Sequence, residues 1–282
     1  MTRVAESIES IRQMVKSAGS EGKMIGLVPT MGALHAGHGE LIEQARQGCD
    51  FVVVSIFVNP LQFGPAEDFG KYPRDVDSDV EYCRRLGVDA VFVPPVQVLY
   101  PEPFLTFVEV TRVTEELCGR FRPGHFRGVT TVVLKLLNVV QPNRAYFGEK
   151  DAQQLAAVRR MVADLNLPVE IVSVPTVREP DGLAMSSRNR YLDPEQRRVA
   201  PSVYRALQAA RRAIDDGIRD AAEVKRIAGD VLGRERQLET QYLEVVDAAL
   251  MTPVERIEGP VRVAAAVWLG STRLIDNIYC EA

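Results

Sequence analysis

The chain has 282 residues, 46% of them hydrophobic, which is enough for one large domain or two ordinary ones with a full apolar core. Its formal net charge of −4 argues against a nucleic-acid partner, because proteins that bind nucleic acid usually carry a strongly basic domain. The N-terminus has no apolar signal core, and no run approaches the roughly 18 apolar residues of a membrane span, which predicts a cytoplasmic protein without a membrane partner. The four cysteines are scattered, so neither a disulfide framework nor a structural metal site is expected.

Strand and helix signals alternate through about the first 175 residues. Residues 24–28 and 51–58 read as buried strands, and 39–47 between them carries apolar side chains at helical spacing. Two such strands joined by a helix form a parallel βαβ unit. The alternation continues with segments at 75–86, 90–93, 129–140, 145–147, 151–165 and 169–174. It predicts an α/β fold, a Rossmann-like doubly wound parallel sheet.

The pattern changes after a polar loop at 178–182, which places a domain boundary near Val177. Asp193 followed by Pro194 is a good helix start, and helical segments are expected from there to about 214 and over 221–236. Strand-like runs without intervening helices follow at 241–246, 261–268 and 272–279. We therefore expect a Rossmann-like domain at 1–176 and a smaller C-terminal α+β domain at 177–282, with an antiparallel sheet and two helices.

Two of the three histidines lie in one turn, where the first buried strand passes into a helix. His35 and His38 are separated by three positions with Gly37 between them, so both imidazoles can project from one face of the first helical turn. A helix N-terminus at the carboxyl end of a parallel strand favours anions. The spacing predicts a phosphate site. The alternative is structural, with one histidine capping the helix and the other packing against the sheet.

Two further stretches carry groups suited to phosphate. Gly148, Lys150 and Asp151 lie where another strand opens into a helix, which predicts a second phosphate-facing turn or, alternatively, an ordinary capped helix start. Residues 186–188, Ser-Ser-Arg, offer two hydroxyls and a guanidinium that can clasp a triphosphate from a mobile loop. A plain surface turn is the alternative for that loop.

Polar side chains also follow the second buried strand. Asn59 and Gln62 lie at its carboxyl end, where their amides can orient a polar organic substrate or simply cap a loop. Residues 122–128 form a cationic stretch with glycines, expected to be a loop that covers the site or caps the next helix. The usual phosphate signatures are missing: there is no GxGxxG, and the P-loop-like stretch at 64–71 has one residue too many and is followed by Tyr72. A kinase or a Rossmann dehydrogenase is therefore disfavoured.

An ordered set of motifs extends from about Ile25 to Leu192. The motifs are Pro29-Thr30-Met31-Gly32 with His35-Ala36-Gly37-His38, Phe57-Val58-Asn59-Pro60-Leu61-Gln62-Phe63, Tyr72-Pro73-Arg74, Arg122-Pro123-Gly124-His125-Phe126, Phe147-Gly148-Glu149-Lys150-Asp151-Ala152-Gln153-Gln154 and Met185-Ser186-Ser187-Arg188-Asn189. HxGH alone indicates only the wider nucleotidyltransferase superfamily, which includes class I aminoacyl-tRNA synthetases. The ordered set is far more specific, and it resembles the pantoate–β-alanine ligase family.

The resemblance implies an ATP-dependent condensation of (R)-pantoate with β-alanine, which yields pantothenate, AMP and pyrophosphate through a pantoyl-adenylate intermediate in coenzyme A biosynthesis. It implies ATP as co-substrate and a homodimer. Mg²⁺ is expected as well, held mainly by the triphosphate oxygens, because the sequence shows no dedicated cage of carboxylates. Residues 1–176 would bind ATP and pantoate, and residues 177–282 would act as a lid.

The resemblance also implies roles for individual residues. ATP would be bound by Met31, Gly32, Ala33, Leu34, His35, Ala36, Gly37, His38, Gly148, Glu149, Lys150, Asp151, Val177, Met185, Ser186, Ser187 and Arg188. Pantoate would be held by Gln62 and Gln154, with Asn59 and Tyr72 in support. The groups expected to act on the reacting phosphates are His38 as proton donor, His35, Lys150, Ser186, Ser187 and Arg188.

Two other functions fit parts of the pattern. A sister nucleotidyltransferase would keep the nucleotide attached to its product, and it would share the HxGH turn but would not need amides such as those of Gln62 and Gln154 for an organic acid. A non-catalytic adenine-nucleotide sensor would bind without turnover.

Overall fold

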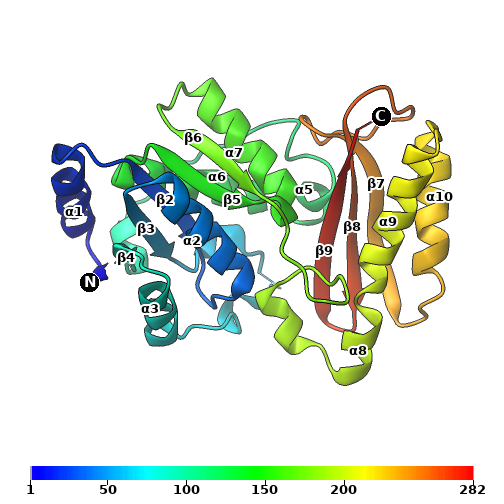
Figure 1. The fold of residues 1–282 in the computed structure, drawn as a ribbon, viewed down its shortest axis with the longest axis horizontal. Helices are drawn as coiled ribbons and strands as arrows, with labels where there is room; N and C mark the ends of the chain where they lie inside the picture. Colours follow the sequence, from blue (N-terminus) through cyan, green and yellow to red (C-terminus); the bar gives the residue numbers. More distant parts are fainter. Residues whose placement is uncertain (1, 66, 282) are drawn as a thin grey trace. The chain divides into compact units, whose positions relative to one another are not determined.

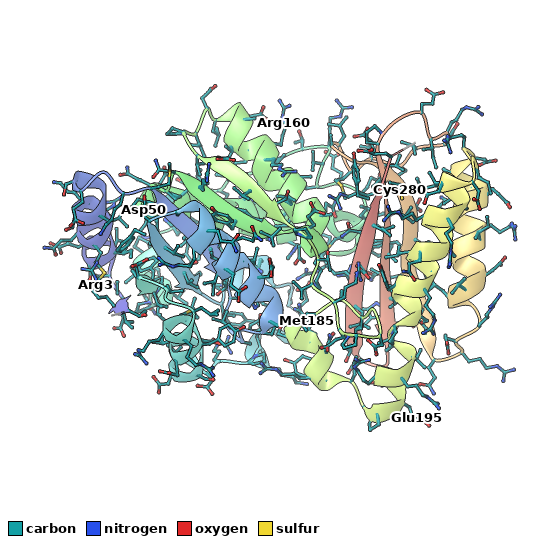
Figure 2. The ribbon with its side chains drawn as sticks, in the orientation of Figure 1. Arg3, Asp50, Arg160, Met185, Glu195 and Cys280 are labelled. Atoms are coloured by element: carbon teal, nitrogen blue, oxygen red, sulfur yellow. The ribbon has the colours of Figure 1, made fainter. Side chains whose placement is uncertain are left out.

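The computed structural model describes residues 2–65 and 67–281 (Figures 1 and 2). Their contacts group into two compact units. The first holds the chain up to Val110 together with Arg122–Glu149 and Ala157–Pro175. The second holds Thr111–Phe121, Lys150–Ala156 and the chain from Thr176 onward. Two segments that precede residue 176 thus pack with the second unit. The domain boundary expected between residues 176 and 177 stays a prediction.

The first unit is built on a six-stranded sheet in which every neighbouring pair of strands is parallel. Its strand order is β1-β4-β3-β2-β5-β6. The strands are β1 (Arg3–Ala5), β2 (Ile25–Thr30), β3 (Phe51–Ile56), β4 (Ala90–Phe92), β5 (Arg144–Gly148) and β6 (Glu170–Val174). The expected doubly wound parallel sheet is confirmed, with β2 at its centre (Figure 1).

Helices join these strands. They are α1 (Ile8–Ser20), α2 (Ala36–Gly48), α3 (Val76–Arg85), α4 (Val96–Leu99), α6 (His125–Val140) and α7 (Ala152–Asp164), with short 3-10 turns η1 (Pro60–Gln62), η2 (Asp68–Gly70) and η3 (Glu149–Asp151). Across the described ranges, none of the helices combines the length and the apolar character needed to cross a membrane.

The central strands are buried on both faces, which explains their continuous apolar sequence. Val28, Val52 and Val54 pack with Ile42 of α2 and Val80 of α3 in one apolar cluster. Because side chains alternate along a strand, the buried residues between them face the opposite side of the sheet. The core therefore holds the carboxyl edge of the sheet in place.

The second unit contains a three-stranded antiparallel sheet of order β7-β8-β9, with α9 and α10 packed on it (Figure 1). Its elements are α5 (Cys118–Phe121), η4 (Ser187–Tyr191), α8 (Pro194–Val199), α9 (Ser202–Asp215), α10 (Ala221–Leu232), β7 (Leu238–Asp247), β8 (Val261–Leu269) and β9 (Thr272–Cys280). The expected antiparallel sheet with two helices is confirmed.

Three local expectations differ from the structure. No element is expected before residue 24, yet α1 forms there, capped by Ser7 and burying Ile11, Val15 and Ala18. The segment from 193 to about 214 is not continuous, because Pro201, which has no N–H to donate, separates α8 from α9. The stretch 122–128 is not all loop, since α6 already begins at His125.

The four cysteines are free and buried, as their scattered spacing predicts. Burial raises the pKa of Cys83 to about 12 and that of Cys280 to about 11. Both side chains are therefore neutral thiols at physiological pH, and they act as small apolar groups in the core.

Candidate functional site

The candidate site begins at the carboxyl edge of the parallel sheet. From β2 the chain proceeds through β3 and β4 on one side, whereas β5 and β6 lie on the other side. Ligands of such sheets bind where the strand order reverses, beyond the carboxyl ends of the strands. The turn 31–38 follows β2, Asn59 follows β3, and Gly148 ends β5. The sheet topology therefore brings three of the predicted segments to one edge.

The two histidines of this turn cap the helix that they begin. His35 is the N-cap of α2, and its Nδ1 accepts a hydrogen bond of 3.1 Å from the Gly37 N–H. The Nδ1 of His38 accepts from the His35 N–H at 3.3 Å, which completes a reciprocal capping box. The rings lie 4.2 Å apart between centroids.

These caps assign the tautomer of both rings. A ring nitrogen that accepts a hydrogen bond carries no proton, so the proton of each neutral imidazole is on Nε2. His35 and His38 thus use Nδ1 to hold the backbone and keep Nε2–H as a donor. The structural alternative is confirmed for His35 as a cap, and the same geometry leaves both rings suited to a phosphate oxygen.

The loop before the histidines is held by a buried carboxylate that is not among the predicted site residues. Asp79 on α3 accepts hydrogen bonds of 2.8 Å from the Ala33 N–H and of 2.8 Å from the Leu34 N–H. Gly32 and Ala33 have positive φ angles of 82° and 52°. A Cβ at Gly32 would lie 2.7 Å from Asp79 Oδ2, so this position requires glycine. The available signal was an acid on the apolar face of α3, beside Val80.

The amide groups after β3 form a second part of the site. Asn59 caps η1, and its Oδ1 accepts from the Tyr100 hydroxyl at 2.8 Å. Asn59 Nδ2 donates to Gln62 Oε1 at 3.1 Å, and Gln62 Nε2 donates to Met31 Sδ at 2.9 Å. Both amides are almost fully buried. The structure therefore joins Gln62 to the turn after β2, with Asn59 orienting it.

Tyr72 lies in an aromatic cluster close to these amides in sequence. Its buried ring meets Phe63 edge-on at 6.0 Å, and Phe63 meets Phe69 at 5.4 Å. The guanidinium of Arg74 covers Phe69 and donates to the Tyr72 carbonyl at 3.3 Å. The pantoate role expected of Tyr72 stays a prediction.

In the second unit, a short hairpin and the turn that follows it contain five predicted residues. The Met185 N–H donates to the Val177 carbonyl at 3.0 Å, and the hydroxyl of Ser186 accepts from the Arg188 N–H at 3.3 Å as the cap of η4. Ser187, next to them, is buried. Met185 is labelled in Figure 2. The loop is thus held by its own hydrogen bonds, and its expected contact with a triphosphate stays a prediction.

Strand β9 anchors both predicted ATP segments of the second unit. The Arg178 guanidinium donates to the two carboxylate oxygens of Asp276 at 2.6 and 3.0 Å, and it stacks 3.7 Å from the ring of Tyr204. The neighbouring Asn277 donates from Nδ2 to the Lys150 carbonyl at 3.0 Å. The Lys150 ammonium is 3.8 Å from the Asp151 carboxylate, a loose ion pair that leaves both groups able to reorient.

The two glutamines at the start of α7 differ in their surroundings. The buried amide of Gln153 accepts from the Cys118 N–H at 3.0 Å and donates to the carbonyls of Val113 and Glu116 at 2.9 and 2.7 Å. These three hydrogen bonds hold the segment 111–121 and engage both the oxygen and the nitrogen of the Gln153 amide. Gln154 is only half-buried, so it remains the candidate amide for the acid substrate.

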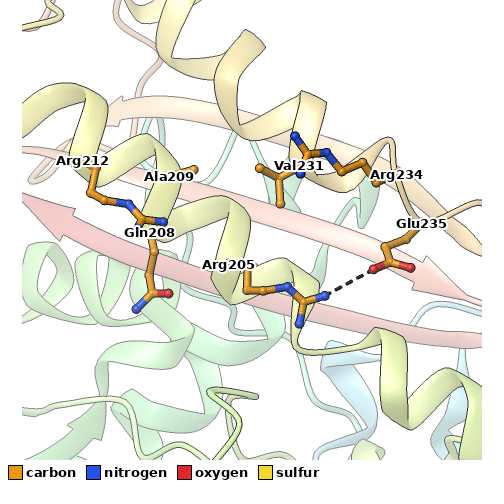
Figure 3. Close-up of a pocket in the computed structure, with 7 residues that line it drawn as sticks. All are labelled: Arg205, Gln208, Ala209, Arg212, Val231, Arg234 and Glu235. Carbon is orange, nitrogen blue, oxygen red and sulfur yellow. Dashed lines mark hydrogen bonds and ion pairs between the residues drawn. The ribbon is translucent and has the colours of Figure 1, made fainter.

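The second unit also has a surface hollow of about 450 Å³ between α9 and α10, drawn in Figure 3. It is lined by Arg205, Gln208, Ala209, Arg212, Val231, Arg234 and Glu235, and an ion pair of 3.3 Å joins Arg205 to Glu235. None of the predicted site residues lines it. The hollow offers charge but no nucleophile, and it is not the candidate site.

Comparisons with known proteins agree on one family. The model of the family described as pantoate-beta-alanine ligase matches residues 3–279. A pantothenate synthetase of Moorella thermoacetica is 54% identical over 276 residues, which cover 98% of each chain, and one of Thermotoga neapolitana is 52% identical over 275 residues, which again cover 98% of each chain.

Solved structures agree with the sequence relatives. The crystal structure of pantothenate synthetase from Thermus thermophilus has a TM-score of 0.93 and 47% identity, with 98% of each chain covered. Pantoate-beta-alanine ligase from Francisella tularensis, solved with beta-gamma ATP and beta-alanine, has a TM-score of 0.82 and 34% identity over 99% of this chain and 97% of that chain.

Asp79→Asn should loosen the turn after β2. An asparagine supplies one acceptor oxygen and one NH₂ group, so one of the two backbone N–H donors of Ala33 and Leu34 would face another donor. We expect a loss of about 1–3 kcal/mol in the free energy of unfolding, measured by urea denaturation. Asp77→Asn, on the exposed side of the same helix, is the matched control. Equal effects of the two substitutions would contradict the role of Asp79.

Proposed function

The chain belongs to the pantoate–β-alanine ligase family, and from that premise we propose that it joins pantoate to β-alanine with ATP, giving pantothenate, AMP and pyrophosphate. The observation that carries the proposal is the reciprocal cap of His35 and His38, which presents two Nε2–H donors at the switch point of the sheet. Met31, in the same turn, is hydrogen-bonded to the amide of Gln62. This contact supports a proposal in which the phosphate site adjoins the acid site.

The first step activates the acid. A carboxylate is a poor acyl donor, so an oxygen of pantoate attacks the α-phosphorus of ATP, the bond from that phosphorus to the bridging oxygen breaks, and pyrophosphate leaves. The product is pantoyl adenylate, a mixed anhydride. Negative charge increases on the phosphate oxygens in the transition state, and each preorganised donor directed at them can contribute about 3–4 kcal/mol.

Six side chains are proposed as donors for this step. His35 and His38 contribute Nε2–H groups, and the Nε2–H of His38 donates a hydrogen bond to the leaving pyrophosphate. Lys150, Ser186, Ser187 and Arg188 add an ammonium, two hydroxyls and a guanidinium. Support for the second group is its ordered framework: Asn277 holds the Lys150 carbonyl, and Ser186 caps η4.

The remaining proposed ATP contacts are backbone and apolar groups near these donors. They are Met31, Gly32, Ala33, Leu34, Ala36 and Gly37 in the first turn, Gly148, Glu149 and Asp151 in the second, and Val177 and Met185 in the hairpin. In the first turn the N–H groups of Gly32, Ala33, Leu34, His35 and Gly37 already donate to protein side chains. These occupied N–H groups support the histidine rings, rather than backbone amides, as the proposed phosphate donors there.

The second step forms the amide. The amine of β-alanine attacks the acyl carbon of the adenylate, the carbon–oxygen bond to the phosphate breaks, AMP leaves, and the nitrogen loses a proton. No covalent bond to the protein is needed. Gln62 and Gln154, supported by Asn59 and Tyr72, would hold the pantoyl group, and positioning of this kind supplies about 7–11 kcal/mol in well-oriented reactions.

Magnesium, the assembly state, the lid and the location complete the proposal. Within residues 2–65 and 67–281, no group of three or more His, Cys, Asp or Glu side chains is placed to hold a metal ion. Mg²⁺ would therefore arrive on the triphosphate oxygens, as a hard cation that keeps several of its waters, and would neutralise part of the charge.

We further propose a cytoplasmic homodimer in which residues 177–282 act as a lid over an ATP- and pantoate-binding domain at 1–176.

Incubation of the purified chain with ATP, Mg²⁺, D-pantoate and β-alanine should give pantothenate and AMP in equal amounts. Mass spectrometry of the products provides the measurement, and omission of each substrate in turn is the control. ADP in place of AMP would indicate an acyl-phosphate route. A product that retains the nucleotide would support the sister nucleotidyltransferase, and ATP binding without any turnover would support the sensor.

His38→Asn should abolish adenylate formation while leaving the fold intact. The asparagine oxygen can replace Nδ1 as acceptor for the His35 N–H, but no donor remains at the position of Nε2. We expect pantoate-dependent exchange of labelled pyrophosphate into ATP to fall about 10²–10³-fold. His38→Gln, which places an N–H near that position, should retain more activity. Near-normal exchange in His38→Asn would refute the proposed role.

Gln62→Ala should impair pantoate capture more than ATP binding. The substitution removes the amide that adjoins the turn, so the KM for pantoate should rise about 10–100-fold, while the KM for ATP stays within about twofold. Gln97→Ala, an exposed glutamine on α4, is the matched control. If both Michaelis constants rose together, Gln62 would not be the pantoate ligand.

A further inference from the structure

The main-chain carbonyl of Gln62 is held by two side chains from the stretch 122–128. His125 Nδ1 lies 2.8 Å from this oxygen, and Arg122 Nη2 donates to it at 3.3 Å. Both residues come from the loop and first turn of α6, which pack against η1. Arg122 and His125 of this stretch thus face the backbone of η1, and the expectation that the stretch covers the site stays a prediction.

The hydrogen bonds assign the protonation of His125. A guanidinium can only donate, and Arg122 Nη1 lies 3.1 Å from His125 Nε2, so Nε2 is an acceptor without a proton. The proton of the neutral ring is then on Nδ1, from which it is donated to the Gln62 carbonyl. Arg122 thus sets the tautomer that His125 needs in order to hold this oxygen.

Glu67 fixes the guanidinium in turn. Arg122 Nε donates to Glu67 Oε1 at 2.8 Å, and Nη2 pairs with Oε2, so the two groups meet as a fork. The pair is largely buried, with 16% and 25% of the two side chains exposed. Burial acts to raise the pKa of Glu67, but the hydrogen bond and charge of Arg122 outweigh it and hold that pKa below its ordinary value. Glu67 is therefore ionised at neutral pH.

The other side of η1 is equally constrained. Asn59 Nδ2 donates to the Gly128 carbonyl at 3.0 Å as well as to Gln62 Oε1. A Cβ at Gly128 would lie 2.3 Å from the Leu61 carbonyl oxygen, so only glycine permits this contact of the helix with η1. Backbone and side chain of Gln62 are thus both attached to the start of α6, the first by His125 and Arg122 and the second through Asn59.

We propose that Arg122 and His125, oriented by Glu67, are positioning residues that fix the carbonyl of Gln62 and thereby aim its side-chain amide at the acid substrate. The proposal rests on the role of Gln62 in binding pantoate. An amide on a 3-10 turn that is free to rotate would lose the geometry needed for capture, and small displacements of such groups are costly in rate. Neither Arg122 nor His125 needs to touch substrate to have this effect.

His125→Phe tests the proposal, because it keeps a flat ring but removes the donor to the Gln62 carbonyl. We expect the KM for pantoate to rise about tenfold while the KM for ATP stays within about twofold. His125→Asn, which places an amide N–H close to the position of Nδ1, should recover most of the loss. Arg127→Gln is the control on the same helix, because the Arg127 guanidinium lies 4.0 Å from the centre of the Phe107 ring. This substitution should leave the KM for pantoate and the KM for ATP unchanged.

Thermal unfolding of each variant separates positioning from folding. If His125→Phe does not fold, Arg122→Lys provides the second test, because it keeps the charge but loses the fork to Glu67 and the donor to His125. It should also raise the KM for pantoate selectively. An equal rise in both Michaelis constants, no change in either, or a failure of His125→Asn to recover affinity would overturn the proposal.

A double-mutant cycle with Gln62→Ala distinguishes this proposal from the function on which it rests. If His125 acts through Gln62, His125→Phe should change the KM for pantoate by less than about twofold once Gln62 is alanine. If the two effects multiply independently, the positioning role is refuted while the role of Gln62 stands. If Gln62→Ala itself leaves pantoate affinity unchanged, the proposed function of Gln62 fails, and the positioning proposal fails with it.

Discussion

The candidate site depends on the carboxylate of Asp79. Its two oxygens accept from consecutive backbone N–H groups at Ala33 and Leu34, in a turn whose positive φ angles are unfavourable for most residues. This contact sets the direction in which the chain leaves β2, and hence where α2 begins. The two histidines then complete the turn by capping α2 with Nδ1, which leaves both rings with the proton on Nε2. A buried acid on one helix thus decides the geometry of imidazoles on another.

Other candidate functional groups are also held in place by hydrogen bonds from neighbouring side chains. Asn59 holds the side-chain amide of Gln62, and His125 holds the main-chain carbonyl of the same residue. The Tyr100 hydroxyl in turn donates to Asn59. Burial raises the pKa of Tyr100, so its hydroxyl stays a neutral donor. In the second unit, two adjacent side chains of β9 anchor the hairpin and the Lys150 segment. Preorganisation of this kind means that donors need not reorient when charge develops on a substrate, which is how electrostatic catalysis is achieved.

Much of the fold followed from pattern alone. Buried strands such as 51–58 are recognisable because a parallel strand covered on both faces is apolar throughout, and the antiparallel sheet followed from strands without intervening helices. The misses have physical causes. The α8–α9 break depends on one proline, and α6 begins four residues before its apolar stretch because Gly124 with φ of 81° allows the chain to enter the helix there. The helix α1 is the exception, because Ile11, Val15 and Ala18 already have the apolar spacing that is typical of a helix.

The sequence by itself determined the family, the chemical groups and the edge of the sheet at which they gather, because motif order and strand alternation are local properties of the chain. Only the tertiary structure decided which of those groups are available for chemistry and which hold others in place. Asp79 and Gln153 are buried and occupied by backbone groups from 35 to 46 residues away, and His125 faces a carbonyl 63 residues distant. Hydrogen bonds over such separations depend on how elements pack, so no local pattern can reveal them.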